Sequence, residues 1–448
     1  RTLGTQMKAT GEVMAIGRNF EESLLKAIDS LDIKLNYHIG MKEITTWSDQ
    51  EIISSLKNPD DERIFVISEA LNRGYTVDDI HEITRIDRFF IRKLQNINNI
   101  SKKVKACKGK TIDRALLYEC KKYGFADSYI AELLNTSEQE IKDLRKQYGI
   151  NPVYKMVDTC AGEFKAVTPY YYSSYDMYDD AKPSEGQKVI IIGSGPIRIG
   201  QGIEFDYCSV HCAKALRELG LKAIIVNNNP ETVSTDFDIS DVLYFEPLTK
   251  ECVLDIIERE KPLGVVVQFG GQTAINLAQP LAGAGVNILG TAVEDIDKAE
   301  DREEFLKVLK SLNIPMPAGS TAFSTDDAVR IAERIRYPVL VRPSYVLGGR
   351  AMELVYNNEE LLEYMKAAVV VSHNHPVLVD KYIPGKEVEI DGISDGKDVL
   401  VVGIMEHIER AGVHSGDSIA VYPAQTLTDE TKKAIVDYSV KIARVLNI

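Results

Sequence analysis

The sequence predicts a multidomain α/β protein in which an all-α domain precedes a parallel sheet. Three observations lead to this prediction. The chain has 448 residues, which is more than one hydrophobic core supports. Residues 32–168 are rich in helix formers and contain two similar helix-turn-helix segments. A buried apolar strand begins at Lys188 and opens a βαβ unit.

Composition narrows the class of protein. The hydrophobic fraction is 44%, there is no apolar run long enough to cross a bilayer, and residues 1–12 do not resemble a signal peptide. Six scattered cysteines suit reduced thiols, so a cytoplasmic location is expected. The net charge of −14 disfavours unspecific binding to nucleic acid or to anionic lipid. Because the chain starts without Met, we expect an excised fragment.

The first half of the chain divides into a tail, a helical domain and a connector. Residues 1–31 end in an amphipathic helix over residues 19–28. Within the helical domain, residues 32–168, the segment 74–83 resembles the segment 124–133, and a second short helix follows each of them. The connector, residues 169–187, contains a tyrosine cluster without helix or strand periodicity.

Helix-turn-helix units raise the alternative of DNA binding through their second helices. The basic residues that support this alternative are Arg85, Arg88, Arg92, Lys93, Lys142, Arg145 and Lys146. Acidic residues are interspersed among them, and the whole chain is acidic. Packing or self-association is therefore the favoured role of this domain, and no nucleic-acid partner is expected.

Residues 188–297 predict a doubly wound parallel sheet. The strand 189–192, a glycine-rich turn and the helix 205–219 precede a second strand over residues 222–226. The glycines of residues 193–200 approach the dinucleotide fingerprint. A dinucleotide site needs a carboxylate after the second strand, but three asparagines stand there instead, so a nicotinamide cofactor is not expected.

One helix of this domain carries a possible metal motif, Cys208, His211 and Cys212. Zinc sites in proteins usually need four ligands, and only three candidates gather here. The apolar neighbours Val210 and Ala213 indicate a packed helix, so core thiols are the favoured interpretation.

Residues 298–448 alternate strands and helices and contain a candidate phosphate loop. The run Arg-Pro-Ser-Tyr-Val-Leu-Gly-Gly-Arg, residues 342–350, lies between two apolar strands and reads as a hairpin. Glycines let backbone N–H groups approach an anion, and an arginine offers a planar fork of donors to phosphate oxygens. A second polar loop, residues 406–418, combines imidazoles, carboxylates and glycines after a buried strand, which favours a nucleotide site.

Five motifs in this order resemble the large subunit of glutamine-dependent carbamoyl phosphate synthetase. They are residues 200–207, 229–236, 268–273, 342–350 and 412–418. By this resemblance residues 1–31 are similar to the end of the N-terminal synthetase half and residues 32–168 to the oligomerisation domain. Residues 188–297 are similar to the pre-ATP-grasp domain and residues 298–448 to a C-terminally truncated ATP-grasp domain.

The resemblance implies an ATP-dependent ligase with ATP and Mg²⁺ or Mn²⁺ as cofactors. In such enzymes the second half phosphorylates carbamate to carbamoyl phosphate for arginine and pyrimidine biosynthesis. The implied partners are a glutaminase small subunit and further copies of the chain, bound through the helical domain. The implied catalytic residues are Arg302 and Arg342. The implied ATP-binding residues are these two together with Gly348, Gly349, Lys381, Ile383, Glu387, Gly412, Val413, His414 and Ser415.

One departure and two alternatives accompany this interpretation. The resemblance places the family's magnesium ligands after Ile448, so we expect no metal ligand in the chain, weak nucleotide binding and no activity of the chain alone. A biotin-carboxylase-like or purine-pathway ATP-grasp ligase would share the fold and the ATP chemistry. A pure assembly module, acting through residues 32–168, is the alternative from a different class.

Overall fold

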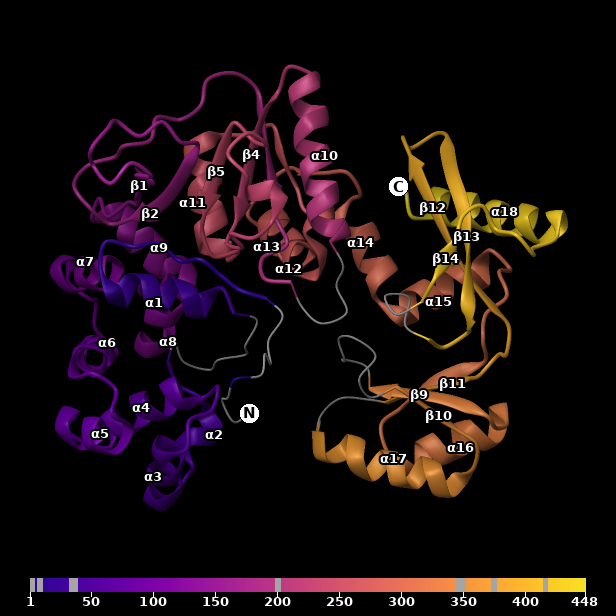
Figure 1. Cartoon of the computed structure of the whole chain (residues 1–448), viewed down its shortest axis with the longest axis horizontal. Helices are drawn as coiled ribbons and strands as arrows, with labels where there is room; N and C mark the ends of the chain where they lie inside the picture. The colour runs from indigo at the N-terminus through magenta and orange to yellow at the C-terminus, as the bar shows by residue number, and fades with distance from the viewer. Residues whose placement is uncertain are drawn as a thin grey trace. The chain divides into compact units, whose positions relative to one another are not determined.

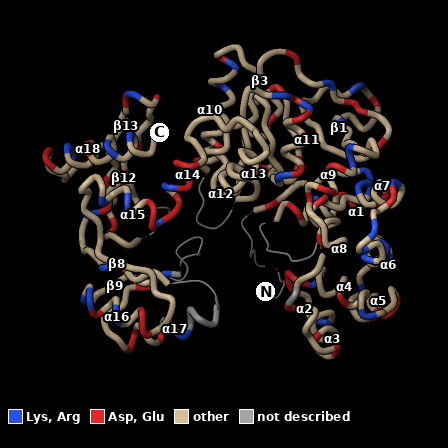
Figure 2. Tube along the Cα trace, turned by 180° about the vertical axis from the view of Figure 1, so that it is seen from behind, with Lys and Arg blue, Asp and Glu red and all other residues tan. Residues whose placement is uncertain are grey.

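The chain forms two compact units, each of which is described by itself. The computed structural model describes residue 5 and residues 11–31, 39–197, 203–343, 352–371, 377–413 and 418–448. The described residues up to Leu289 make one unit, and those from Gly290 to Ile448 make the other (Figure 1). In Figure 2, acidic and basic positions are interspersed along both units.

The first part of the first unit is all-helical, as the sequence predicted. Its described helices are α1 (Phe20–Asp29), α2 (Lys42–Thr45), α3 (Asp49–Lys57), α4 (Arg63–Asn72), α5 (Val77–Thr84), α6 (Arg88–Lys105), α7 (Arg114–Lys122), α8 (Asp127–Leu134) and α9 (Glu138–Gln147). A continuous core joins them through fully buried side chains that include Ile91, Ile97, Leu117 and Ile130. Trp47 packs against this core.

The internal repeat is confirmed in the helix pairs α5–α6 and α8–α9. A glycine with positive φ precedes each pair, Gly74 at 96° and Gly124 at 86°. The first helix of each pair ends at a left-handed residue, Arg85 in one and Asn135 in the other, with φ of 60° and 59°. Equivalent residues of the two pairs are separated by the same interval in sequence, so the similarity of sequence reflects a similar turn geometry.

The second part of the first unit is a seven-stranded sheet in the order β1-β2-β5-β4-β3-β6-β7. All neighbours are parallel except β1 and β2, so the predicted doubly wound parallel sheet is confirmed. Its strands are β1 (Val153–Met156), β2 (Tyr170–Ser174), β3 (Lys188–Ile192), β4 (Lys222–Asn227), β5 (Val242–Phe245), β6 (Gly264–Val266) and β7 (Ile288–Leu289). The helices around it are α10 (Glu204–Glu218), α11 (Lys250–Glu260), α12 (Gly271–Ile275) and α13 (Ala278–Gly283), with short 3₁₀ turns at Val233–Thr235 and Gln268–Gly270.

Two of these strands come from segments that the sequence did not predict as part of the sheet. The irregular connector predicted over residues 169–187 is wrong for Tyr170–Ser174, which pairs with β5 as β2. β1 lies within the stretch predicted to be helical, and it pairs with β2. Aromatic packing explains the result, since the Tyr170 ring lies 5.5 Å from that of Phe245 and the Tyr154 ring 5.0 Å from that of Tyr244.

Ion pairs between helices join the two parts of the first unit. Lys121 Nζ lies 2.6 Å from Glu251 Oε1 of α11 and 2.9 Å from Asp127 Oδ1. Arg145 Nε lies 2.8 Å from Asp127 Oδ2, and its Nη2 lies 3.3 Å from Asp255 Oδ2 of α11. We call these five residues the junction cluster, because they hold α7, α8 and α9 against the sheet domain.

The second unit contains two antiparallel sheets. The first has the order β10-β9-β11-β8 and the second the order β12-β13-β14. Strands β9 and β10 are antiparallel neighbours, so the predicted hairpin around residues 342–350 is confirmed in its two strands. The strands are β8 (Gly319–Ala322), β9 (Val339–Pro343), β10 (Glu353–Val355), β11 (Val377–Lys381), β12 (Lys386–Ser394), β13 (Val399–Arg410) and β14 (Ala420–Val421).

Helices complete the second unit. They are α14 (Val293–Glu300), α15 (Arg302–Ser311), α16 (Thr325–Ile335), α17 (Asn358–Val371) and α18 (Asp429–Val445). The core of the four-stranded sheet is formed with α16 and α17 by buried side chains such as Ala328, Val341, Leu361 and Val379. In the described part of the chain, none of the helices combines the length and the apolarity that a bilayer crossing requires.

Candidate nucleotide site

Two arginines predicted to bind phosphate lie beside the central strands of the four-stranded sheet. Arg342 is near the end of β9, where its Cα faces that of Leu378 in β11, and its side chain is exposed. Arg302 begins α15, and its Nη2 forms an ion pair with Oδ1 of Asp380 in β11. Among the described residues, Nη1 of Arg302 is buried without a hydrogen-bond partner. An orphaned guanidinium nitrogen is costly to bury unless a ligand anion satisfies it.

Lys381 ends β11 and is held by backbone carbonyls. Its Nζ lies 3.0 Å from the carbonyl oxygens of both Arg336 and Tyr337. An ammonium group carries three protons, so these two contacts leave one donor for a ligand. The side chain is therefore oriented by the turn that precedes β9.

The second group of predicted residues lies where β12 begins and β13 ends. Gly412 N donates to Glu387 Oε2 at 3.1 Å, which joins the start of β12 to the turn after β13. Tyr382, next to Lys381, donates from its hydroxyl to the carbonyl oxygen of Ala411 at 3.2 Å. This contact ties the end of β11 to the same turn, so the two predicted groups are brought together.

Apolar side chains stand in this second group. Ile383 is 54% exposed and Val413 is 38% exposed. Exposed aliphatic side chains next to oriented polar groups are typical of the wall on which a ligand ring rests. Four of the predicted residues, Gly348, Gly349, His414 and Ser415, lie outside the described residues.

Sequence reasoning missed the ion pair that fixes the start of β12. Lys386 Nζ pairs with Glu406 of β13, and Glu406 Oε2 also accepts from Gln425 N at 3.0 Å and from Thr426 N at 2.8 Å. The hydrogen bond from Lys386, helped by those from Thr426, lowers the pKa of Glu406 to about 2. The polar loop predicted over residues 406–418 is wrong for residues 406–410, which belong to β13, and alternation along this strand places Glu406 and His407 on opposite faces of the sheet.

His407 makes a second contact that the sequence did not reveal. Its Nε2 lies 3.1 Å from Glu389 Oε1 of β12, and its side chain is only 2% exposed. Among the described residues, its Nδ1 is buried without a partner. Glu387 and Glu389 alternate with Val388 along β12, so both carboxylates belong to the face on which His407 lies.

These residues fit a nucleotide better than they fit a metal ion. Cationic groups with unused donors suit phosphate, a carboxylate with a free oxygen suits ribose hydroxyls, and exposed aliphatic side chains suit a base. In the described part of the chain there is no group of three or more His, Cys, Asp or Glu residues that could hold a metal ion. This statement includes the Cys208, His211 and Cys212 motif on α10.

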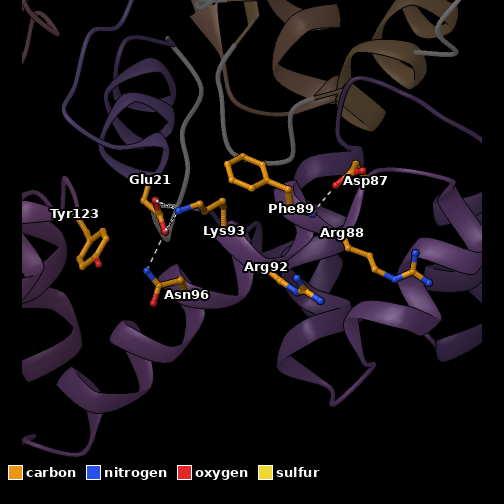
Figure 3. Close-up of a pocket in the computed structure, with 8 residues that line it drawn as sticks. All are labelled: Glu21, Asp87, Arg88, Phe89, Arg92, Lys93, Asn96 and Tyr123. Atoms are coloured by element: carbon orange, nitrogen blue, oxygen red, sulfur yellow. Dashed lines mark hydrogen bonds and ion pairs between the residues drawn. The ribbon is translucent and has the colours of Figure 1, made fainter.

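Six of the seven basic residues that raised the DNA-binding alternative form ion pairs with acidic side chains, and the seventh, Arg92, lines a hollow beside Lys93. Arg88 Nε lies 2.6 Å from Asp78 Oδ1 and Arg85 Nη1 lies 2.7 Å from Glu82 Oε2. Lys93 lines a hollow of about 560 Å³ in the helical part, where Figure 3 shows it pointing toward Glu21. The helix pair α8–α9 has the same arrangement, since its basic residues pair with acidic residues of α11. Acidic side chains thus lie beside most of these basic residues, which disfavours binding to DNA phosphates.

Three family models match the chain in succession. Residues 12–149 match the carbamoyl-phosphate synthetase large chain oligomerisation domain, and residues 185–298 match the carbamoyl phosphate synthase preATP-grasp domain. Residues 301–448 match the carbamoyl-phosphate synthase L chain ATP binding domain. A helical region followed by a pre-ATP-grasp sheet and an ATP-binding domain defines a multidomain ATP-grasp protein. The order of the three matches places it more narrowly: the chain belongs to the carbamoyl phosphate synthetase large-chain family, an ATP-dependent ligase family.

Solved structures share only parts of this chain. The biotin carboxylase domain of 2-oxoglutarate carboxylase from Hydrogenobacter thermophilus is 22% identical, with a TM-score of 0.46 over 59% of this chain and 59% of that one. Biotin carboxylase from Campylobacter jejuni is 20% identical, with a TM-score of 0.46 over 58% and 59%. N5-carboxyaminoimidazole ribonucleotide synthetase from Thermus thermophilus is 19% identical, with a TM-score of 0.45 over 58% and 64%. The chain thus spans about three-fifths of the length of these relatives.

Proposed function

We propose that this chain supplies the half of a carbamoyl phosphate synthetase that phosphorylates carbamate with ATP. The observation that carries the proposal is the unbroken order of the oligomerisation, preATP-grasp and ATP-binding matches along one chain. A biotin-carboxylase-like or purine-pathway ligase would account for an ATP-binding domain but not for the oligomerisation domain upstream of it. The product, carbamoyl phosphate, would serve arginine and pyrimidine biosynthesis in the cytoplasm.

In this proposal ATP, when bound, supplies the phosphoryl group that carbamate receives. Arg302 and Arg342 neutralise charge on the phosphate oxygens, for which Arg302 has an unsatisfied Nη1. Glu387, oriented by Gly412 N, accepts from the ribose hydroxyls. Ile383 and Val413 shield the base from water, and Lys381 adds one donor beside them.

Four predicted residues complete the proposed site. Gly348 and Gly349 would close over the phosphates, and His414 and Ser415 would complete the pocket next to Val413. Mg²⁺ or Mn²⁺ would accompany the nucleotide, with ligands other than the described residues. A glutaminase subunit would supply ammonia to the partner half, where bicarbonate is activated.

Substitution of Arg342 in a complete large subunit tests the proposal. With Arg342→Ala, carbamoyl phosphate formation should fall about 10²-fold or more, because a donor to the transferring phosphoryl group is lost. Bicarbonate-dependent ATP hydrolysis by the other half should stay within about twofold, since only the phosphate contact of one half is removed. An equal fall of both reactions, or a fall of neither, would contradict the assignment.

Self-association is a second role that the oligomerisation-domain match favours. Light scattering of the full chain over a concentration series tests it, and a monomer at the highest concentration would count against it. The two roles are compatible, because the candidate nucleotide site lies in the second unit and the oligomerisation match lies in the first.

A further inference from the structure

A groove of about 750 Å³ lies in the first unit between α9, α11 and α13. It is separate from the candidate nucleotide site and borders the junction between the helical part and the sheet. Domain junctions are preferred places for binding sites, and this volume falls within the usual range for them. Neither the predicted site residues nor the proposed function uses this groove.

The groove is lined by both basic and apolar side chains. Its lysines are Lys142 and Lys146 of α9, Lys250 at the start of α11 and Lys261 directly after α11. Its apolar side chains include Leu254, Ile257, Pro280 and Val286. The whole chain carries a net charge of −14, so a gathering of four lysines around an apolar surface is unusual for it.

The arrangement along α11 is elongated. Lys250, Leu254 and Ile257 recur at helical spacing along α11, and Lys261 follows as its left-handed C-cap residue, with φ of 50° and ψ of 58°. Because α11 has 11 residues, Lys250 and Lys261 stand at the two ends of a stripe roughly 16 Å long. The apolar residues occupy the middle.

The lysines are either unpaired or weakly paired. Among the described residues Lys261 has no ion-pair partner, and Lys250 Nζ lies 3.5 Å from Glu138 Oε2 with both side chains at least one-third exposed. Lys142 and Lys146 share Glu258, whose side chain is 46% exposed. The pairs of Lys250 and Lys146 are exposed and therefore weak, so carboxylates of a ligand can replace them, whereas the side chain of Lys142 is only 15% exposed in its pair with Glu258.

We propose that this groove is a docking surface for an acidic peptide segment of another protein, with an apolar residue between its acidic residues. A compact anion would need cations that converge on one point. Here Lys250 and Lys261 lie at opposite ends, and the two neighbouring lysines already share a carboxylate. An extended strand advances about 3.3 Å per residue, so roughly five residues of a peptide span the stripe. Apolar contact in the middle and charge at the ends then match the groove.

A fluorescence-anisotropy titration of the full chain tests the proposal. The probe is a fluorescein-labelled peptide that alternates Glu and Leu. The control is the same peptide with Gln in place of Glu. We expect saturable binding of the Glu peptide that weakens as salt rises, and at least about tenfold weaker binding of the Gln peptide. The double variant Lys250→Glu/Lys261→Glu should weaken binding of the Glu peptide at least about tenfold.

Control variants separate the groove from the overall charge. Lys57→Glu/Lys102→Glu changes the net charge equally at exposed positions of α3 and α6, and it should bind as the unmodified chain does. If the groove variant fails to fold by circular dichroism, Lys250→Gln/Lys261→Gln replaces it with the same expected direction. Equal loss in the groove and control variants would overturn the proposal, as would equal binding of the two peptides. Displacement of the peptide by millimolar phosphate or glutamate would also overturn it, since it would indicate a site for small anions.

Discussion

The junction cluster and the candidate nucleotide site use similar residues for opposite purposes. In the junction cluster Asp127 accepts from both Lys121 and Arg145, and Glu251 and Asp255 of α11 accept from the same two cations. Asp127, Lys121 and Arg145 are nearly inaccessible, with side chains no more than 2% exposed. These three side chains pair with one another inside the protein and are not accessible to a ligand.

At the candidate nucleotide site the charges are incompletely satisfied. Arg302 is 29% exposed and has one paired and one orphaned terminal nitrogen. Glu387 has one oxygen in a backbone contact, and Arg342 is exposed at the end of its strand. The comparison teaches that the number of unused donors and acceptors, rather than the presence of charge, distinguishes a binding site from a structural contact.

Among the substitutions that test this difference, removal of the Asp127 carboxylate should have the largest effect. Asp127→Ala leaves Lys121 and Arg145 buried without their shared carboxylate, so the free energy of unfolding should fall by about 3–5 kcal/mol. Urea unfolding followed by the fluorescence of Trp47, the single tryptophan of the chain, reports on the helical part directly. Asp78→Ala is the matched control, because Asp78 is 74% exposed and pairs with Arg88 at the surface. A loss in the control as large as that in Asp127→Ala would remove the distinction between buried and exposed pairs.

The pH dependence of stability sharpens the description of the junction cluster. Three carboxylates face two cations there, and burial, together with the charges of Asp127 and Asp255, raises the pKa of Glu251 to about 7. Burial also raises the pKa of Asp255. Titratable neighbours that border the same cluster include Tyr175, Lys142, Cys252, Tyr154, Glu22, Lys26 and Asp29.

A raised carboxyl pKa means that the folded state binds a proton more tightly than the unfolded state. The free energy of unfolding should therefore decrease as pH rises from about 4.5 to about 7, where Glu251 loses this proton in the folded state. Glu251→Gln should remove most of this decrease, and Asp255 should retain part of it. Trp47 fluorescence in urea at several pH values measures the slope, and identical slopes for the two proteins would show that Glu251 does not take up this proton.

Arg302→Ala tests the other side of the comparison. A charge-assisted hydrogen bond contributes about 1.5–3 kcal/mol, so loss of the guanidinium should weaken ATP binding at least about tenfold. Stability should change far less than in Asp127→Ala, because Arg302 is partly exposed and its partner Asp380 keeps access to water. Calorimetric titration with ATP and urea unfolding of the same variant separate the two effects. Arg330→Ala on α16, where the exposed Arg330 pairs with Asp327, is the control for loss of one positive charge.

An Arg302→Ala variant with unchanged ATP affinity and a large loss of stability would place Arg302 with the junction cluster, as a structural residue. The distinction between the junction cluster and the candidate nucleotide site would then not hold for Arg302.

The sequence was sufficient for the elements that local patterns determine. Continuous apolar runs predicted β3, β4 and β5, and the repeated turn residues of the helical part predicted its internal similarity. It failed at β2, because a tyrosine cluster has no alternation of apolar and polar residues and its partners lie far away in the sequence. The junction cluster was likewise unpredictable, since Lys121 and Glu251 become neighbours only through tertiary packing.

At the candidate site the residue types could be predicted from the sequence, but their hydrogen bonds and ion pairs could not. A strand followed by arginine and glycine indicated phosphate chemistry at Arg342, whatever the packing. The pairing of Arg302 with Asp380 depends on how α15 lies against β11, and no local pattern contains that information. Glu387 accepts from Gly412 N, after β13, and Glu406 accepts from Gln425 N, after β14, and local sequence patterns could not predict these hydrogen bonds for the same reason.

The smallest expected effect is on the stability of the second unit, which should depend on pH with the opposite sign. The hydrogen bond from Lys386 lowers the pKa of Glu406 to about 2, so the folded state binds this proton less tightly than the unfolded state. The stability that Glu406 contributes is present above its ordinary pKa of 4.5 and is lost as pH falls toward about 2, the opposite sign to Glu251. Hydrogen exchange of amides in β12 and β13, measured at pH 5 and pH 3, should show faster exchange at pH 3 after correction for the intrinsic rate. Glu406→Gln should abolish that difference, and an unchanged difference in this variant would assign the acid sensitivity of the sheet to another group.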